Sequence, residues 1–277
     1  MREGLSNLFR HRVLIQSLVM RELKARYRGS VGGYLWSFFN PLLLLAVYFV
    51  VFTTVFSPPQ AEFGDTQPYA LFLFCGLLPW TWFASSLSDA ANSLIAGGNL
   101  IKKLIFPAEV LPVVSVLANG VHFLLGLPVY LAFWLAFKPE GLSVHVLWLP
   151  LVVLTQLILS LGLGLILAAL AVHFRDIRDI LANALTLWFF LTPIIYSRQF
   201  LQERADAVDA TWVPKVVAQV LDLNPMTHVM DGYHRAIFEG ALVPWKRLPV
   251  TLAVAVLILL VGYGLFDRLR DSFPEEV

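Results

Sequence analysis

The chain consists of long uncharged runs separated by short charged segments. A helix needs about 20 apolar residues to cross the hydrocarbon core of a bilayer, so runs of that length predict membrane-spanning helices. The runs predict six helix cores, at residues 35–56, 69–88, 111–136, 145–171, 180–197 and 248–266. The fifth is short and contains Pro193, so a broken helix, or one that does not fully cross, is an open alternative there. The pattern therefore predicts an all-α membrane protein with six transmembrane helices.

The basic residues predict how these helices are oriented. Thirteen of the 20 Lys and Arg lie in residues 1–28, in the loops 89–109 and 172–179, and in the C-terminal tail. The other side has one after the third span and six spread over 198–247. Lys and Arg favour the cytoplasmic side of a membrane. We therefore expect both termini in the cytoplasm and a single membrane domain at 34–277.

Residues 1–33 predict a helix at the membrane surface followed by an elbow. One face of this helix is apolar and consists of Leu5, Leu8, Phe9, Val13, Ile15, Val19, Met20, Leu23 and Tyr27. A basic amphipathic helix of this kind lies in the plane of the interface. Either it only anchors the chain to an anionic leaflet, or its arginines bind an anionic lipid head group. The glycines that follow, Gly29, Gly32 and Gly33, let the chain turn from lying flat to standing upright.

Aromatic residues align on one face of the first predicted span. The stripe consists of Tyr34, Phe38, Tyr48, Phe49, Phe52 and Phe56, and the fifth predicted span carries a smaller stripe of Phe189, Tyr196 and Phe200. Aromatic stripes usually pack against lipid or neighbouring helices. They can also form a wall over which sugars slide, because a flat ring combines contact area with tolerance for movement. Both interpretations stay open, and the stripes are candidate channel walls.

Composition and missing motifs narrow the function. The chain is 58% hydrophobic and 14% charged, with a mean hydropathy of +0.73, which is typical of a polytopic membrane protein. The net charge of +1 does not indicate a nucleic-acid partner, and the single cysteine, Cys75, excludes an internal disulfide framework. The sequence has no phosphate-binding loop and no metal motif, and its predicted span cores contain no Asp, Glu, Lys or Arg. These features argue against a gradient-driven carrier and against a membrane transferase, so transport would draw its energy from another chain.

The loop between the second and third spans predicts a short helix at 97–107. Asn99 is the expected N-cap, and Pro107 follows the last turn. This helix either lies beneath the head groups or docks into a groove of a soluble partner.

Small residues recur on the fourth predicted span. The series is Ser160, Gly164 and Ala168, at a spacing that lets two helices approach closely. The close contact lies either within the fold or across a dimer.

Five segments together resemble a known family. They are RELKARYRGSVGGYLWSFFNPLL (21–43), FPAEVLPV (106–113), HFRDIRDIL (173–181), LTPIIYS (191–197) and LNPMTHVMDGYHRAIFEG (223–240). In this order, over nearly the whole chain, they resemble the permease subunits of ABC-2-type polysaccharide exporters, which include O-antigen, capsule and teichoic-acid exporters. One departure is that His234 stands between Tyr233 and Arg235, where the family pattern has the arginine directly after the tyrosine.

The resemblance implies a homodimer in the bacterial inner membrane that pairs with two copies of a separate ATPase. ATP and Mg²⁺ would bind that partner, and this chain would carry no cofactor and no catalytic residue. The implied cargo is an undecaprenyl-pyrophosphate-linked polysaccharide, with the O-antigen of lipopolysaccharide favoured. Capsule or teichoic acid, and a non-sugar lipid or drug, are alternatives. A membrane enzyme acting on lipid-linked sugars would need a catalytic carboxylate or metal cluster, and the sequence shows neither.

The resemblance also implies roles for particular residues. Arg21, Arg26 and Arg28 would attract the pyrophosphate head group, because a guanidinium donates paired hydrogen bonds. The two aromatic stripes would line the path of the glycan. The coupling helix that touches the ATPase would consist of Leu100, Ile101, Leu104, Ile105 and Phe106. Residues 198–247 would form an external segment whose short helices gate the pore mouth.

Overall fold

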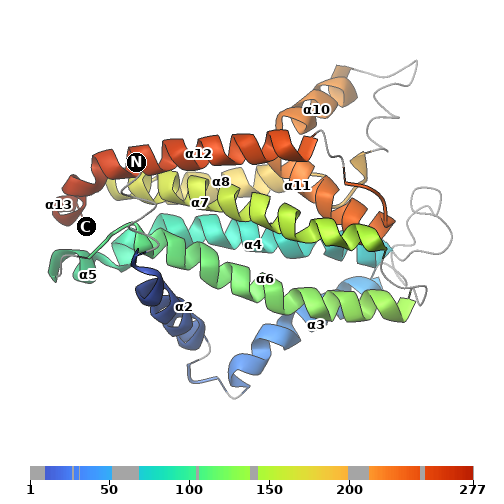
Figure 1. The fold of residues 1–277 in the computed structure, drawn as a ribbon, viewed down its shortest axis with the longest axis horizontal. Coiled ribbons are helices and arrows are strands. Elements are labelled where there is room, and N and C mark those ends of the chain that lie inside the picture. The colour runs from blue at the N-terminus through green and yellow to red at the C-terminus, as the bar shows by residue number, and fades with distance from the viewer. Residues whose placement is uncertain are drawn as a thin grey trace.

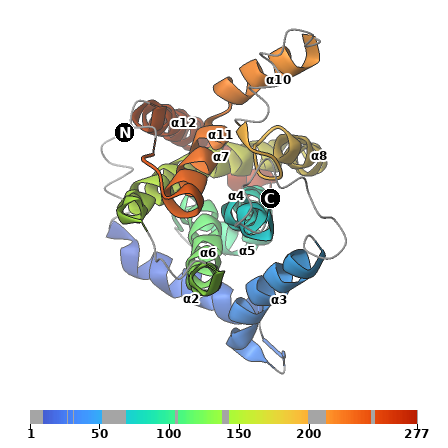
Figure 2. The same cartoon turned by 90° about the vertical axis from the view of Figure 1, so that its right-hand side faces the viewer.

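A bundle of long helices forms the body of the computed structural model. The structure describes residues 10–26, 28–30, 32–51, 69–103, 106–137, 143–198, 212–243 and 247–276, and the regular elements within these ranges are helical. The bundle is made by α4 (Tyr69–Ala96), α6 (Val110–Phe137), α7 (Leu149–His173) and α12 (Arg247–Leu269). Figure 1 shows these helices running along the long axis of the molecule, and Figure 2 shows the bundle from one end.

Four of the six predicted spans are confirmed by length and composition. In the described part of the chain, Tyr69–Ala96, Val110–Phe137, Val144–His173 and Arg247–Glu276 are long and apolar enough to cross a membrane. The third of these begins with the short 3₁₀ helix η4 (Val144–Trp148). The fourth continues past α12 through η6 (Arg270–Ser272) and α13 (Phe273–Glu276).

The first and fifth predicted spans are shorter in the structure. For the first span, α3 (Trp36–Val50) has 15 residues, and the rest of the predicted core, 52–56, lies outside the described residues. For the fifth, α8 (Ile177–Phe190) has 14 residues. The prediction of a helix continuing to 197 is wrong, because Pro193 disfavours a helical conformation in the residue before it and the chain turns at 191–196. The alternative of a broken fifth helix fits this observation.

The N-terminal helix α2 (Arg12–Arg26) packs against protein through part of its apolar face. Ile15, Leu18, Val19 and Leu23 are buried and form a cluster with the first turns of α6. Val13 and Met20, which the sequence assigns to the same face, are instead exposed, at 70% and 53%. One part of the apolar face therefore packs against α6, and the part that carries Val13 and Met20 remains exposed.

The region between α8 and α12 contains helices that differ in burial. Figure 1 shows α10 (Trp212–Leu223) projecting from one end of the bundle. The next elements, α11 (Pro225–Tyr233) and the π-helix η5 (His234–Glu239), pack into the bundle, with Met226, Met230 and Tyr233 fully buried in the main core. The predicted external segment thus contributes part of the core.

Asn224 fixes the point at which the chain packs back into the bundle after α10. Its side chain caps α11 by accepting a hydrogen bond from the backbone N–H of Met226, while Pro225 occupies the first helical position. The same amide accepts from the indole of Trp188 at 2.9 Å and donates to the backbone carbonyl of Leu191 at 3.0 Å. One buried residue therefore ties the start of α11 to the broken end of α8.

α7 and α12 cross closely through two glycines. A Cβ placed on Gly162 would lie 2.6 Å from the backbone nitrogen of Leu259, and one placed on Gly262 would meet the carbonyl oxygen of Gly162. The predicted small series on α7 serves a different contact. Gly164 faces Ala90 and Val116, so that series packs α7 within the fold against α4 and α6.

Candidate lipid and coupling sites

The predicted elbow lies between α2 and α3. Gly29 has φ of +83° and Gly33 has φ of +49°, both in the left-handed region that favours glycine. The short 3₁₀ helix η1 (Gly33–Leu35) follows and leads into α3 at Trp36. The chain therefore turns between α2 and α3, and an elbow at the membrane surface stays a prediction.

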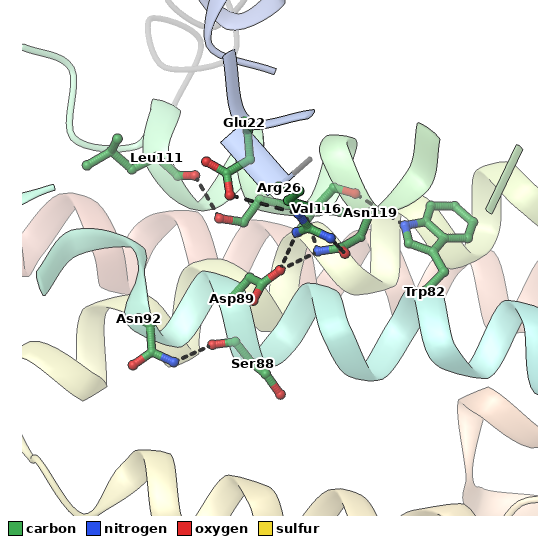
Figure 3. A network of polar contacts seen from close by, with 10 residues as sticks. Glu22, Arg26, Trp82, Ser88, Asp89, Asn92, Leu111, Val116 and Asn119 are labelled. Atoms are coloured by element: carbon green, nitrogen blue, oxygen red, sulfur yellow. Dashed lines mark hydrogen bonds and ion pairs between the residues drawn. The ribbon is translucent and has the colours of Figure 1, made fainter. Parts of the chain in front are cut away.

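Arg26, the last residue of α2, is held by the bundle. It donates one hydrogen bond from Nη1 to Asn119 Oδ1 at 2.9 Å and another from Nη2 to Asp89 Oδ2 at 2.7 Å. Asn119 in turn donates to the same Asp89 oxygen at 2.8 Å, so α2, α4 and α6 meet in one network (Figure 3). Glu22 lies 4.0 Å from Arg26 Nε. The predicted trio is thus divided: all three arginines lie at the surface, but the Arg26 side chain, 29% exposed, is bonded to α4 and α6.

Sequence reasoning missed Asp89 and Asn119 as partners of Arg26. The available signal was that Asp89 directly follows an uncharged run and that Asn119 is one of few polar residues in the predicted spans. Neither observation identifies Arg26 as the partner, because Asp89 and Asn119 are 63 and 93 positions away from Arg26 in the sequence.

A polar cavity of 210 Å³ opens beside this network. Its polar lining consists of Arg26, Asn40, Thr81, Ser85, Asn119 and His122, and the rings of Trp36, Trp82 and Phe123 complete its wall. An apolar groove of 450 Å³ runs between α3 and α4 and shares Asn40, Leu78 and Thr81 with the cavity. The two hollows therefore adjoin one another.

The described aromatic residues of the stripes make packing contacts. The ring of Phe49 lies 5.6 Å from that of Phe133 and 4.9 Å from that of Phe137, both on α6. Phe189 meets Trp80 edge to face at 5.7 Å, and the Tyr196 hydroxyl donates to the carbonyl of Phe190 at 2.9 Å.

The remaining stripe residues lie outside this description. The side chains of Tyr34, Phe38 and Tyr48 are not among the described atoms, and Phe52, Phe56 and Phe200 are outside the described residues. Within this chain, α3 and α8 each contact α4. A glycan path along these rings stays a prediction.

The short helix after the second span is α5 (Gly98–Lys103). It begins within the predicted range of 97–107, but the backbone N–H of Leu100 donates to the carbonyl of Gly97 at 2.8 Å, so Asn99 lies inside the helix and the N-cap prediction is wrong. The predicted end is also wrong, because Phe106 and Pro107 are not helical. Gly97 takes the cap position because a Cβ there would lie 2.5 Å from Leu111 Cδ1, which favours a residue without a side chain.

Of the predicted coupling residues, three are described. Leu100, Ile101 and Phe106 are partly buried against a cluster that contains Phe266 and Phe273 from the C-terminal end of the chain. Leu104 and Ile105 lie outside the described residues. The loop is therefore braced by α13, while Asn99 and Lys102 on α5 are exposed.

A second charged network, which sequence reasoning did not identify, lies at the end of the bundle opposite to α5. Arg198 has a side chain only 10% exposed and donates to Asp231 at 2.7 Å and to Asp222. Arg247 lies 3.6 Å from Asp222. Burial lowers the pKa of His228, and the charges of Arg198 and Arg247 lower it further although Asp231 opposes them, so His228 is neutral at pH 7. Arg235, in contrast, is exposed and lies 3.9 Å from Glu239.

Comparison with known proteins identifies the family. A sequence model described as ABC-2 type transporter matches residues 13–238. The chain belongs to the ABC-2 type transporter family. As a member of this family it is a membrane permease, which agrees with the resemblance that the five sequence segments indicate.

Individual relatives match over almost their full length. The O-antigen export system permease protein RfbA of Myxococcus xanthus is 39% identical over 98% of this chain and 97% of its own length. A protein of the same name from Klebsiella pneumoniae is 31% identical over 95% and 94%. The polysialic acid transport protein KpsM of Escherichia coli is 21% identical over 94% and 95%.

Proposed function

We propose that this chain is the membrane permease of an ATP-driven exporter that carries O-antigen polysaccharide across the bacterial inner membrane. The full-length similarity to O-antigen export permeases, at 30–39% identity, carries this proposal. Relatives named for capsule or polysialic acid transport are 21–22% identical. The difference favours O-antigen over capsule.

The proposed working unit is a six-span homodimer with two copies of a separate ATPase. The chain has no phosphate-binding loop in its sequence, which supports placing ATP and Mg²⁺ on the partner. In this unit α3 and α8 would be the first and fifth spans. A helix of about 15 residues is about 22 Å long, short of the ~30 Å hydrocarbon core, so each would rely on neighbouring segments to complete its crossing.

Both termini would lie in the cytoplasm. Two observations support this: α2 packs on the first turns of α6, and α13 packs on α5, so both described ends of the chain lie at the end of the bundle that carries the α5 loop. That loop would be the coupling segment, touching the ATPase through its exposed side and residues 104–105. Movement of the ATPase would reach the bundle through Phe106 and the C-terminal cluster that it contacts.

The cargo would be an undecaprenyl-pyrophosphate-linked glycan whose head group meets the elbow. Arg21 and Arg28 are exposed and would attract it, while Arg26 leads into the polar cavity. The glycan would then pass between protomers beside α3 and α8, and α10 and α11 would gate the far end.

A gene deletion tests the proposal. Removing this gene should eliminate O-antigen from surface lipopolysaccharide and leave its lipid-linked precursor inside the cell, with capsule unchanged. Restoring the gene should restore O-antigen, whereas restoring it without the ATPase should not. A deletion strain with normal surface O-antigen, or one that loses only capsule, would contradict the assignment.

A further inference from the structure

The helix α10 is attached to the described part of the bundle through its last turn. Figures 1 and 2 both show this helix standing away from the bundle. Most of its described side chains are exposed, namely Val216, Gln219, Val220, Asp222 and Leu223, whereas Leu221 near its end is buried. Among the described residues, the side-chain polar contacts between α10 and other elements all involve Asp222. A single residue therefore accounts for the polar attachment of the helix.

Asp222 contacts three different segments. Its carboxylate accepts a hydrogen bond from Arg198 and lies 3.6 Å from Nη1 of Arg247. Its backbone carbonyl accepts from Nε2 of His228 at 3.0 Å, and because a carbonyl oxygen can only accept, this nitrogen carries the proton. Arg198 follows the turn after α8, His228 lies on α11, and Arg247 begins α12. The end of α10 is thus tied to three segments at once.

The neighbouring helix α11 is fixed in the bundle. Its residues Met226, Thr227, Val229 and Met230 have no exposed surface. A Cβ placed on Gly232 would lie 2.9 Å from Cγ2 of Val152, so α11 packs directly on α7. The bundle therefore holds α11 along its length, in contrast to α10.

A short joint separates the two helices. Asn224 lies between them with φ of −78° and ψ of 113°, an extended conformation, and Pro225 disfavours a helical conformation in the residue before it. The joint keeps α10 and α11 from forming one continuous helix. α10 can therefore change its direction at Asn224 while α11 stays in place.

The two acidic partners of Arg198 differ in burial. Asp231 on α11 is 14% exposed and lies 2.7 Å from Arg198, whereas Asp222 is 51% exposed. If Asp222 leaves, Arg198 keeps Asp231, and water solvates the released carboxylate, so no charge is left buried without a partner. Ion pairs that water reaches are individually weak. The contacts of Asp222 can therefore break and form again while the rest of the network stays intact.

We infer that Asp222 is a latch: its contacts with Arg198 and Arg247 hold α10 against the bundle, and their release lets α10 rotate about Asn224 and open the far end of the export path. The inference rests on the proposed function, in which α10 and α11 gate that end. It adds that α10 is the moving part, that α11 is the fixed part, and that Asp222 sets the resting position. Movement of α8 reaches the latch through the chain that leads to Arg198.

The position of α10 can be measured as a distance within one chain. Spin labels are attached at Gln219→Cys on α10 and at Val250→Cys in the first turn of α12, because both positions are exposed. Cys75 is buried and takes up no label. The full chain is placed in nanodiscs, labelled copies are diluted with unlabelled ones, and the distance between the labels is measured by double electron–electron resonance. One main distance is expected for the resting chain.

Asp222→Asn tests the latch, since it keeps the size of the side chain and removes its charge. It should shift the balance between attached and released α10 towards release by about fivefold, seen as a larger population at a second distance. Glu239→Gln is the matched control, because Glu239 is exposed to a similar degree, at 48%, and its partner Arg235 lies 3.9 Å away, but it belongs to η5. This control should leave the distances unchanged. Unchanged distances in Asp222→Asn, or an equal change in Glu239→Gln, would overturn the inference.

Fixing α10 in place tests whether export needs its movement. A chain with Asp222→Cys and Arg247→Cys is treated with a cleavable bifunctional thiol reagent in proteoliposomes that also hold the partner ATPase. The cross-link should lower ATP-driven export of the lipid-linked glycan at least tenfold, and cleavage should restore it, while either single-cysteine variant keeps exporting after the same treatment. Undiminished export by the cross-linked chain would overturn the latch and leave the permease function standing. If even the unsubstituted chain exports nothing, the proposed function fails, and the distance measurement, which needs no export, still decides whether Asp222 holds α10.

Discussion

Replacing Gly262 with alanine should weaken the bundle at the close crossing of α7 and α12. A Cβ at this position would meet the carbonyl oxygen of Gly162, and the reciprocal Cβ on Gly162 would lie 2.6 Å from the Leu259 nitrogen. Ordinary contacts begin near 3.4 Å, and the Cβ of Gly262→Ala would fall about 1 Å short of that distance, so α7 and α12 would have to separate by about 1 Å. A gap of that size forfeits a quarter to a half of the dispersion energy of the atoms that it parts. We therefore expect a loss of about 1–3 kcal/mol in the free energy of unfolding.

Gly264, two residues further along α12, supplies the matched control. A Cβ there meets nothing within 4 Å, so Gly264→Ala changes helix propensity without changing contacts. Alanine is favoured over glycine in a helix by up to about 1 kcal/mol, and this gain is common to both variants. The difference between their free energies of unfolding therefore reports the contact between α7 and α12 alone.

The assay is reversible unfolding of the isolated chain in mixed micelles of increasing SDS content, followed by circular dichroism. Gly264→Ala should be at least as stable as the unsubstituted chain, and Gly262→Ala less stable than Gly264→Ala by about 1–3 kcal/mol. Equal stabilities of the two variants would refute the close crossing of α7 and α12.

Two further predictions concern the ends of the bundle. Arg198→Ala should lower the free energy of unfolding by about 3 kcal/mol, because it leaves the largely buried Asp231 without its partner. Arg270→Ala, which breaks only exposed pairs, should lower it by less than about 1 kcal/mol in the same SDS titration. Equal small losses would show that the Arg198 network does not stabilise the fold. Ile101→Glu should prevent the ATPase from co-purifying, since a charge there cannot stay against the C-terminal cluster that braces α5, and Lys102→Ala, at an exposed side chain, should retain it. Retained co-purification and stimulated ATP hydrolysis with Ile101→Glu would contradict the coupling role of this loop.

Hydrophobic pattern predicts the long helices well because each depends on local sequence. The four spans at α4, α6, α7 and α12 follow directly from runs of apolar residues. The turn between α2 and α3 was also predictable, since Gly29 and Gly33 adopt backbone angles that other residues disfavour. Pro193 indicated a break in the fifth span, and α8 ends before it at Phe190.

The pairings between distant segments could not be predicted in this way. Arg26 was assigned to a lipid head group from its place on α2, and nothing local indicates that it bonds Asp89 and Asn119. The spacing of small residues on α7 predicted a close contact but not its partner. The close crossing of α7 and α12 instead uses Gly162 with Gly262, which are 100 positions apart and belong to helices whose adjacency the sequence does not specify.

Reconstituted transport tests the central claim most directly. The purified chain and its proposed partner ATPase are placed together in proteoliposomes, and movement of undecaprenyl-pyrophosphate-linked O-antigen across the bilayer is measured after ATP is added. We predict transport with both proteins and ATP, and neither transport nor ATP hydrolysis with this chain alone. Transport by the isolated chain, ATP hydrolysis by the isolated chain, or no movement of the lipid-linked glycan with both proteins present would contradict the account.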